Sequence, residues 1–312
     1  MIPVGNPAGD DAATGTEDSS SRFRGLDTWR TGDILEALWG GQSRAVAACL
    51  PALPALARAV DGAAARLAGA NGRLVYVGAG SSGMLAALDA LELGPTFNWP
   101  EDRTLVFVAG GLDTRRGPNP VAEDDAAGGR NRARDAALGA ADVVLGISAS
   151  GNSAYTVAVL EHARAHGAMT IAVTGMAESP LVRAADHAVV AATGPEVITG
   201  STRLGAGTAQ KLILNLFSTA VMVRLGFVFD NLMIDVRPEN AKLRQRRTAI
   251  VASIANVDRA TAADALARHG DVKRAVLGLA GLADDEIEAA LASVGGNLRA
   301  ALARARSPGS LP

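Results

Sequence analysis

Residues 73–83 read RLVYVGAGSSG, and residues 143–153 read VVLGISASGNS. Each stretch begins with a short run of apolar, partly β-branched residues and ends in a turn of glycines and serines. The apolar run has the length and composition of a buried strand, and such a turn commonly leads into a helix. The two stretches therefore predict two strand–turn–helix units of an α/β protein.

Three further apolar runs have the same character. TLVFVAGG occupies residues 104–111, MTIAVTG residues 169–175 and HAVVAA residues 187–192, with helical patterns between them. Brief strands that alternate with amphipathic segments are typical of a parallel sheet covered by helices on both faces. The sequence therefore predicts an α/β fold with a doubly wound, mainly parallel sheet.

Regions of different composition flank the predicted sheet. The N-terminus is rich in glycine, acidic and hydroxyl residues, which favours a mobile arm. From Trp29 to about Ala70, apolar residues at helical spacing predict two or three helices. After Arg247 only short helical patterns remain, separated by turns. We expect an arm over residues 1–25, a sheet domain with N-terminal helices over 26–250 and a small helical domain over 251–312.

Composition limits the classes of partner. The chain has 312 residues and a formal net charge of −2, and its basic residues are scattered. Because no basic block is present, we expect neither nucleic acid nor membrane as a partner. The N-terminus also lacks the basic start and apolar stretch of a signal peptide, and no uninterrupted apolar run reaches about 18 residues. We therefore expect a cytoplasmic protein.

The cysteine and the histidines give no sign of a metal centre. Cys49 is the single cysteine and has apolar neighbours, which favours a buried structural thiol. His162 and His166 are four residues apart in a helical pattern, but no third ligand is near them in the sequence. A solvated helix face is the better interpretation, so we expect no metal site.

The two serine turns are the first candidate for a ligand site, because ligands of open α/β sheets bind beyond the carboxyl ends of the strands. The glycines of VGAGSSG superficially match the dinucleotide fingerprint, but no convincing acidic partner follows about 20 residues later. Hydroxyls at a helix N-terminus suit a terminal phosphate, although they also cap helices. The predicted phosphate contacts are Ser81, Ser82, Ser148, Ser150 and Ser153.

The arrangement of the two turns resembles the sugar isomerase (SIS) fold, which binds phosphosugars. Three strings are also similar to the N-acetylmuramic acid 6-phosphate etherase family and to its relative, the glucokinase regulatory protein. These strings are GPEVITGSTRLGAGTAQKLILN at 194–215, FDNLMIDVRPENAKL at 229–243 and LDALELGPTF at 88–97. The resemblance covers roughly residues 25–305, including the helical C-terminal region.

The resemblance implies a lyase of cell-wall amino sugar recycling. Enzymes of this family eliminate the D-lactyl group from C3 of the opened sugar 6-phosphate and add water, which gives N-acetylglucosamine 6-phosphate and D-lactate. The elimination needs a base for the C2 proton and an acid for the ether oxygen, and carboxyl groups can fill both roles. The family also implies a phosphosugar substrate, no cofactor and a homodimer, in which a second subunit can contribute site residues.

Two carboxylates are the candidate catalytic residues by this resemblance. The string DALELGPTF places Glu92 in the role of the proton-donating glutamate. The family's second glutamate opens an E-G-x-E-D string, and here Pro120 stands at that position while Glu123 matches the later glutamate. Two alternatives follow: Glu123 or a neighbouring acid replaces the missing group, or the chain no longer performs the whole reaction.

The string at 194–215 is expected to close over the sugar. Its glycines allow the backbone to approach a ligand, and its helix carries positive charge toward the phosphate. The expected substrate contacts there are Glu196, Ser201, Thr202, Arg203 and Lys211. For Arg203 two partners are open, the lactyl carboxylate of the substrate or a structural acid of the protein.

Other departures from the family favour a second hypothesis. Met84 and Asn152 stand where the family has a basic residue after each serine turn, and WGGQS at 39–43 replaces an N-x-E-D string. Neither Met nor Asn can replace a bidentate arginine. These changes favour a non-catalytic phosphosugar-binding regulatory protein. An aldose–ketose isomerase fits the fold but not the etherase-like strings, and a fold alone does not determine chemistry.

Overall fold

The computed structural model describes residues 15–305 except 70, 113, 114, 116, 118 and 239. These residues form two compact units. The first contains the described residues of Met1–Ala90 and Asp102–Ser218, and the second those of Leu91–Glu101 and Thr219–Pro312. The second unit is therefore discontinuous in sequence. Compactness alone does not test which parts fold independently, so the three-part division drawn from the sequence stays a prediction.

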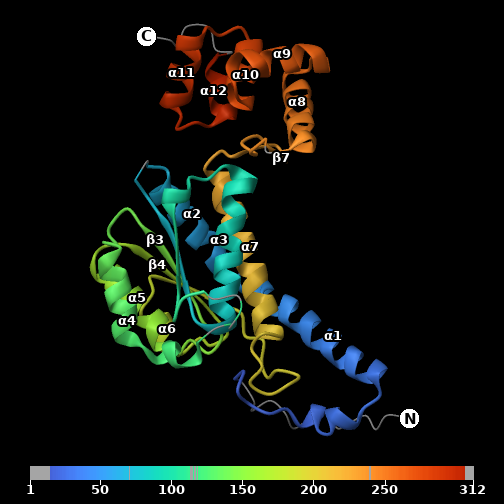
Figure 1. The fold of residues 1–312 in the computed structure, drawn as a ribbon, viewed down its shortest axis with the longest axis vertical. Helices are drawn as coiled ribbons and strands as arrows, with labels where there is room; N and C mark the ends of the chain where they lie inside the picture. The colour runs from blue at the N-terminus through green and yellow to red at the C-terminus, as the bar shows by residue number, and fades with distance from the viewer. Residues whose placement is uncertain are drawn as a thin grey trace. The chain divides into compact units, whose positions relative to one another are not determined.

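The first unit contains a five-stranded parallel sheet with the strand order β2-β1-β3-β4-β5 (Figure 1). All five predicted strands are present, which confirms the predicted fold class. Their bounds are Leu74–Gly78 for β1, Thr104–Val108 for β2, Val143–Ile147 for β3, Met169–Thr174 for β4 and His187–Val190 for β5.

Helices cover both faces of this sheet, which explains why its central strands are buried throughout. Every residue of β1, β3 and β4 is buried. One face packs against α4, α5 and α6, and the other against α2, α3 and α7 (Figure 1). The helices of this unit are α1 (Thr31–Ala48), α2 (Leu53–Leu67), α3 (Gly80–Phe97), α4 (Ala126–Asp135), α5 (Ala154–Ala165), α6 (Pro180–Arg183) and α7 (Gly205–Arg224), of which α3 and α7 continue into the second unit.

The turn from β1 to α3 needs two of its glycines for packing. A Cβ atom on Gly78 would lie 2.8 Å from the backbone nitrogen of Gly83, and a Cβ atom on Gly83 would lie 2.8 Å from the carbonyl oxygen of Gly78. Gly80 between them has a φ of +56°, in the left-handed region. These contacts give the glycines a structural reason that is independent of any dinucleotide.

The second unit is mainly helical, as the sequence predicts for the C-terminal region. Its core includes Ile250, Val276, Ile287 and Leu298. A two-residue antiparallel pair of strands precedes its helices, and the sequence pattern missed it because such short strands show no alternation. The elements are β6 (Val228–Phe229), β7 (Leu232–Met233), α8 (Ala241–Ala255), α9 (Arg259–His269), α10 (Val272–Leu279), α11 (Asp284–Ser293) and α12 (Leu298–Ala305).

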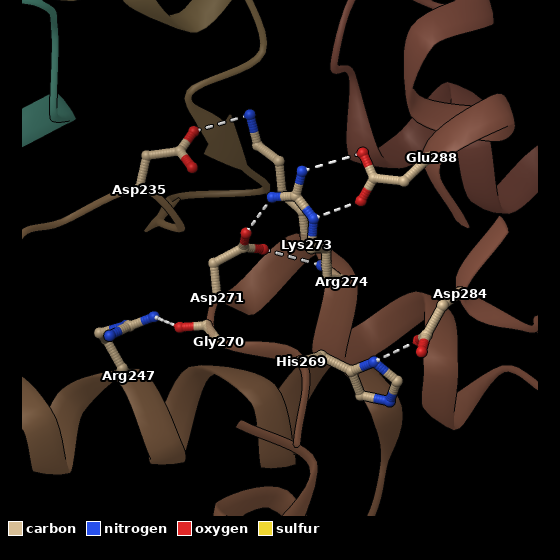
Figure 2. Close-up of polar contacts among 9 residues, drawn as sticks. All are labelled: Asp235, Arg247, His269, Gly270, Asp271, Lys273, Arg274, Asp284 and Glu288. Atoms are coloured by element: carbon tan, nitrogen blue, oxygen red, sulfur yellow. Dashed lines mark hydrogen bonds and ion pairs between the residues drawn. The ribbon is translucent and has the colours of Figure 1, made fainter. Parts of the chain in front are cut away.

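Ion pairs link the helices of the second unit (Figure 2). The Nε atom of Arg274 on α10 lies 2.6 Å from Oε1 of Glu288 on α11, which joins these two helices. Lys273 Nζ lies 2.7 Å from Oδ2 of Asp235, in the segment that follows β7. Burial raises the pKa of the Asp235 carboxyl, and the Lys273 ammonium opposes that rise. We assign this cluster a structural role, because it connects successive elements of one unit.

Candidate functional site

The sheet brings the two predicted serine turns to one edge. Strands β1 and β3 are neighbours and run parallel, so the turns that follow them leave the sheet at the same carboxyl edge. Ser81 and Ser82 lie in the first turn of α3, and Ser148, Ser150 and Ser153 lie between β3 and α5. This edge is also where ligands of open α/β sheets bind.

The first serine turn contacts the helix of the string at 194–215. Ser82 is buried, and its hydroxyl donates a hydrogen bond to Oε1 of Gln210 at 3.0 Å. The amide Nε2 of Gln210 is buried and has no hydrogen-bond partner among the described residues. Ser81 is partly exposed beside them. Gln210 is not among the substrate contacts expected from the sequence, although it starts this helix together with Lys211, which is one of them.

The hydroxyl oxygens of the second turn accept hydrogen bonds from its own backbone. Ser148 Oγ accepts from the Gly151 nitrogen at 3.1 Å, and Ser150 Oγ accepts from the Asn152 nitrogen at 3.2 Å. Ser153 caps α5, where its Oγ accepts from the Thr156 nitrogen at 3.4 Å. A serine hydroxyl can accept two hydrogen bonds and donate one. These contacts therefore explain the turn's shape and leave the predicted phosphate contacts as a prediction.

Glu196 caps the N-terminus of α7. It is buried, and its two carboxylate oxygens accept hydrogen bonds from the backbone nitrogens of Gly205 and Ala206, each at 2.8 Å. A carboxylate at a helix N-terminus satisfies unpaired N–H groups and is stabilised by the helix dipole. This contact joins the loop between β5 and α7 to the first turn of α7. The expected contact of Glu196 with substrate stays a prediction.

We expect Glu196→Gln to lower the free energy of unfolding by about 2 kcal/mol, because hydrogen bonds to a charged acceptor are stronger than those to an amide. The midpoint of urea unfolding measures this change. Glu178→Gln is the control, since Glu178 is exposed. Equal midpoints for both variants would contradict a capping role for Glu196.

The remaining loop residues lie in tight backbone turns. The Ser201 nitrogen donates to the Ile198 carbonyl at 2.9 Å, and the Gly207 nitrogen donates to the Thr202 carbonyl at 2.8 Å. Ser201 and Thr202 are partly exposed, and Arg203 is exposed. The three side chains therefore belong to an ordered loop with surface exposure, which is compatible with their expected contacts with substrate.

The first described residues of the chain pack on this loop. The Thr16 carbonyl accepts a hydrogen bond from the Gly200 nitrogen at 3.2 Å, and Thr16 is buried. A Cβ atom on Gly200 would lie 3.1 Å from Oε2 of Glu17. Part of the segment expected as an arm, namely Thr16 and Glu17, is thus in contact with the motif loop.

Glu123 is positioned in a short 3₁₀ helix, Pro120–Asp124, near the carboxyl end of β2. A Cβ atom on Gly110, two residues after β2, would lie 2.9 Å from the Cβ atom of Ala122, so this helix packs closely on the end of the strand. Burial raises the pKa of the Glu123 carboxyl, and the negative charges of Asp124 and Glu17 raise it further. Glu123 is therefore a carboxyl that holds a proton more tightly than an ordinary glutamate.

Glu92 lies on α3, ten residues after Ser82. That interval corresponds to about 15 Å along the helix axis. The Glu92 side chain is exposed. An exposed carboxyl is accessible to a ligand, but this helix alone does not bring Glu92 to the serine turn.

Lys211 lies near the start of α7, directly after Gln210. Its Nζ atom is 3.9 Å from Oδ1 of Asp89, a buried carboxylate on α3. Asp89 is not among the site residues expected from the sequence, although it begins the string DALELGPTF. A single sequence does not reveal that this aspartate is buried and faces α7.

Residues 121–220 match the SIS domain, and residues 56–164 match the glucokinase regulatory protein N-terminal SIS domain. The chain is 41% identical to the N-acetylmuramic acid 6-phosphate etherase of Rubrobacter xylanophilus, over 94% of this chain and 97% of the relative. The chain belongs to the N-acetylmuramic acid 6-phosphate etherase family. Two further etherases are similar over comparable lengths. The etherase of Deinococcus radiodurans is 41% identical over 95% of this chain and 97% of the relative. The etherase of Streptomyces coelicolor is 44% identical over 90% of this chain and 90% of the relative.

Family membership confirms the resemblance drawn from the motif strings. Membership of the family does not remove the differences from the etherase motifs, among them Met84 and Asn152. Met84 on α3 is 44% exposed, and Asn152 in the second serine turn is also exposed. Both residues are therefore at the surface, where a longer basic side chain could be accommodated without repacking a core.

The histidines and the acidic residues form no metal centre in the described part of the chain. No group of three or more His, Cys, Asp and Glu side chains there is arranged to hold a metal ion. The rings of His162 and His166 stack with their centroids 4.1 Å apart, and His166 Nδ1 lies 2.8 Å from the His162 carbonyl oxygen. We still expect the substrate site of this etherase-family chain to consist of carboxylates, hydroxyls and cationic side chains.

Proposed function

We propose that the chain is a carbon–oxygen lyase acting on N-acetylmuramic acid 6-phosphate. The reaction removes the C2 proton, expels the D-lactyl oxygen from C3 and adds water, giving N-acetylglucosamine 6-phosphate and D-lactate. The observation that carries this proposal is the 41–44% identity to etherases over nearly the whole chain. The assignment of a chemical role to each residue of the site rests on the family motifs.

In this proposal, Glu92 gives a proton to the departing ether oxygen. Glu123 accepts the C2 proton in place of the acid that Pro120 has replaced. The raised pKa of Glu123 supports this assignment, because a stronger base than an ordinary carboxylate is better suited to a carbon acid. The serine turns and Lys211 bind the phosphate.

Release of D-lactate tests the proposal directly. The purified chain is mixed with N-acetylmuramic acid 6-phosphate, and D-lactate is measured with a coupled dehydrogenase. Turnover is expected, and an absence of lactate at micromolar enzyme would reject the lyase.

A non-catalytic phosphosugar sensor is the second candidate. Pro120, Met84 and Asn152 favour it, because each removes a charged group that the etherase pattern contains. The match of residues 56–164 to the glucokinase regulatory protein domain is compatible with it. Calorimetric binding of N-acetylglucosamine 6-phosphate by a chain that releases no lactate would support the sensor.

We also propose a homodimer, with α1 in the interface. Among the residues of α1, only Ala45 is buried within the described chain. Leu35, Trp39 and Val46 on the same helix are 60%, 76% and 50% exposed. Exposed apolar side chains gathered on one helix are typical of a protein–protein interface. A second copy is the occupant we favour, because symmetric pairing of identical chains is the commonest assembly.

We expect Trp39→Glu to convert the dimer into a monomer, because a charge would be buried against the apolar face of the partner. Sedimentation velocity measures the change in mass. Leu112→Glu, in a loop outside α1, is the control because Leu112 is 52% exposed. A wild-type chain that is monomeric at micromolar concentration would contradict the proposed dimer.

We retain the cytoplasm as the expected compartment. Among the described residues, the helical stretch Thr31–Leu67 is long and apolar enough by composition to cross a membrane. That test is weak, because core helices also pass it. The stretch is divided by the 3₁₀ turn Leu50–Ala52, and α2 buries one side against the sheet, so we do not assign it to a membrane.

A further inference from the structure

A buried polar cluster joins β1, α3 and α7. Its centre is Asp89 on α3, which is 1% exposed. Asp89 Oδ2 accepts a hydrogen bond from the Tyr76 hydroxyl at 2.9 Å, and Oδ1 accepts one from the Ser218 hydroxyl at 3.3 Å. Lys211 Nζ lies 3.9 Å from Oδ1. The proposed reaction assigns no step to Asp89, Tyr76 or Ser218.

The carboxylate of Asp89 needs a positive charge nearby. Burying an ionised group is costly unless it is paired as well as hydrogen-bonded. The two hydroxyls satisfy its oxygens but carry no charge, and burial beside Asp89 holds the pKa of Tyr76 well above its ordinary value. Lys211 supplies the opposite charge, so the two groups stabilise each other.

The contact also constrains the lysine. Free lysine side chains have several rotatable bonds and lose about 2 kcal/mol of conformational entropy when fixed. The separation of 3.9 Å is that of an ion pair and exceeds the range of a direct hydrogen bond. Asp89 therefore attracts the ammonium by charge from inside the protein, while 33% of the Lys211 side chain remains exposed.

Lys211, which carries the constrained ammonium, is next in sequence to Gln210, the residue that contacts the first serine turn. Gln210 immediately precedes Lys211, and its Oε1 accepts the hydrogen bond from Ser82. The start of α7 thus contacts the turn that is expected to bind phosphate. Lys211 follows Gln210 on this segment, and for this reason we take its ammonium as a contact of the anionic ligand expected there.

We propose that Asp89 is the positioning residue for Lys211, holding its ammonium in place for the phosphate of the substrate. Fixing the cation before the ligand arrives reduces the entropy lost on binding. This inference rests on the proposed function in taking a sugar 6-phosphate as the ligand and Lys211 as one of its phosphate contacts.

The test is a double-mutant cycle on ligand binding to the full chain. Asp89→Asn keeps the shape of the side chain and removes its charge, and Lys211→Met removes the ammonium. We expect each substitution to raise the Kd for N-acetylglucosamine 6-phosphate about tenfold, the scale of one charged contact. The double variant is expected to bind no more weakly than Lys211→Met alone, because Asp89 acts through Lys211.

Asp142→Asn is the matched control. Asp142 is also buried, its Oδ2 lies 2.7 Å from Arg73 NH2, and it directly precedes β3, at the amino edge of the sheet. This variant is expected to lose stability in urea while keeping the wild-type Kd. A purely structural role for Asp89 would make Asp89→Asn behave in the same way.

Three results would overturn the proposal: an unchanged Kd in Asp89→Asn, an equal additional loss in the Lys211→Met background, or an unchanged Kd in Lys211→Met. The last remains decisive if Asp89→Asn does not fold. Lys211→Arg should bind better than Lys211→Met, since it keeps the charge. Because the ligand is the reaction product, an intact cycle without lactate release would reject the lyase and keep this inference.

Discussion

Glu92→Gln is expected to lower kcat for D-lactate release about 10³-fold, the range lost when a general acid is removed. The amide has nearly the same shape as the carboxyl but cannot give a proton to the departing ether oxygen. Because Glu92 is exposed on α3, the substitution should leave the fold intact. Steady-state rates with N-acetylmuramic acid 6-phosphate measure the effect, and the KM should change little if the contact acts in the transition state.

Glu161→Gln on α5 is the control for this experiment, because Glu161 is another exposed glutamate on a helix. It should keep the wild-type kcat. A loss of less than about tenfold in Glu92→Gln would show that another group protonates the leaving oxygen.

Glu123→Gln is expected to lower kcat about 10²-fold, because it removes the proposed base for the C2 proton. A base must be ionised to act, so the rate should rise with pH through the pKa of Glu123. Since that pKa is raised, the rise should occur above the ordinary glutamate range, which is centred near about 4.3. Glu17→Gln removes one of the negative charges that raise it and should move the rise to lower pH.

Pro120→Glu distinguishes the two alternatives for the second carboxylate: Glu123 acts as the base, or the chain has lost the base and no longer performs the whole reaction. It restores a carboxyl at the position that the family pattern uses. In the Glu123→Gln background, Pro120→Glu should recover activity if a base is the missing group. Val121→Glu in the same background is the control, because it adds a carboxyl to the same turn at a position that the family pattern does not use, and Val121 is 79% exposed. A Glu123→Gln variant with wild-type kcat would contradict the assignment of Glu123.

The sheet was predictable because each of its strands is a compact apolar run. Strands buried on both faces, such as Leu74–Gly78, have no alternation to obscure them, and the glycine and serine turns mark their ends. The same turns pointed to the carboxyl edge of the sheet. Long motif strings then identified the family, which the near full-length relatives confirm.

The contacts of individual polar residues were not predictable from the sequence. Glu196 is expected to contact substrate because it lies in the motif string, but the string did not indicate that its oxygens also cap α7, nine residues later in the chain. Asp89 was not singled out in the sequence, because its hydrogen-bond partner Ser218 lies on α7, more than 120 residues later in the chain. Pairings of this kind depend on tertiary packing, which local spacing does not encode.

The discontinuous second unit limits where the gene can be shortened. Trp99, which is 1% exposed, comes from the segment Leu91–Glu101, and its ring meets that of Phe227 edge to face with centroids 5.8 Å apart. Arg237 also bonds to Asn98 and Glu101 of that segment. A stop codon after residue 218 would leave the apolar surface of Trp99 uncovered. A chain that ends at residue 218 is therefore expected to aggregate, even though residues 219–312 contain none of the residues assigned to catalysis.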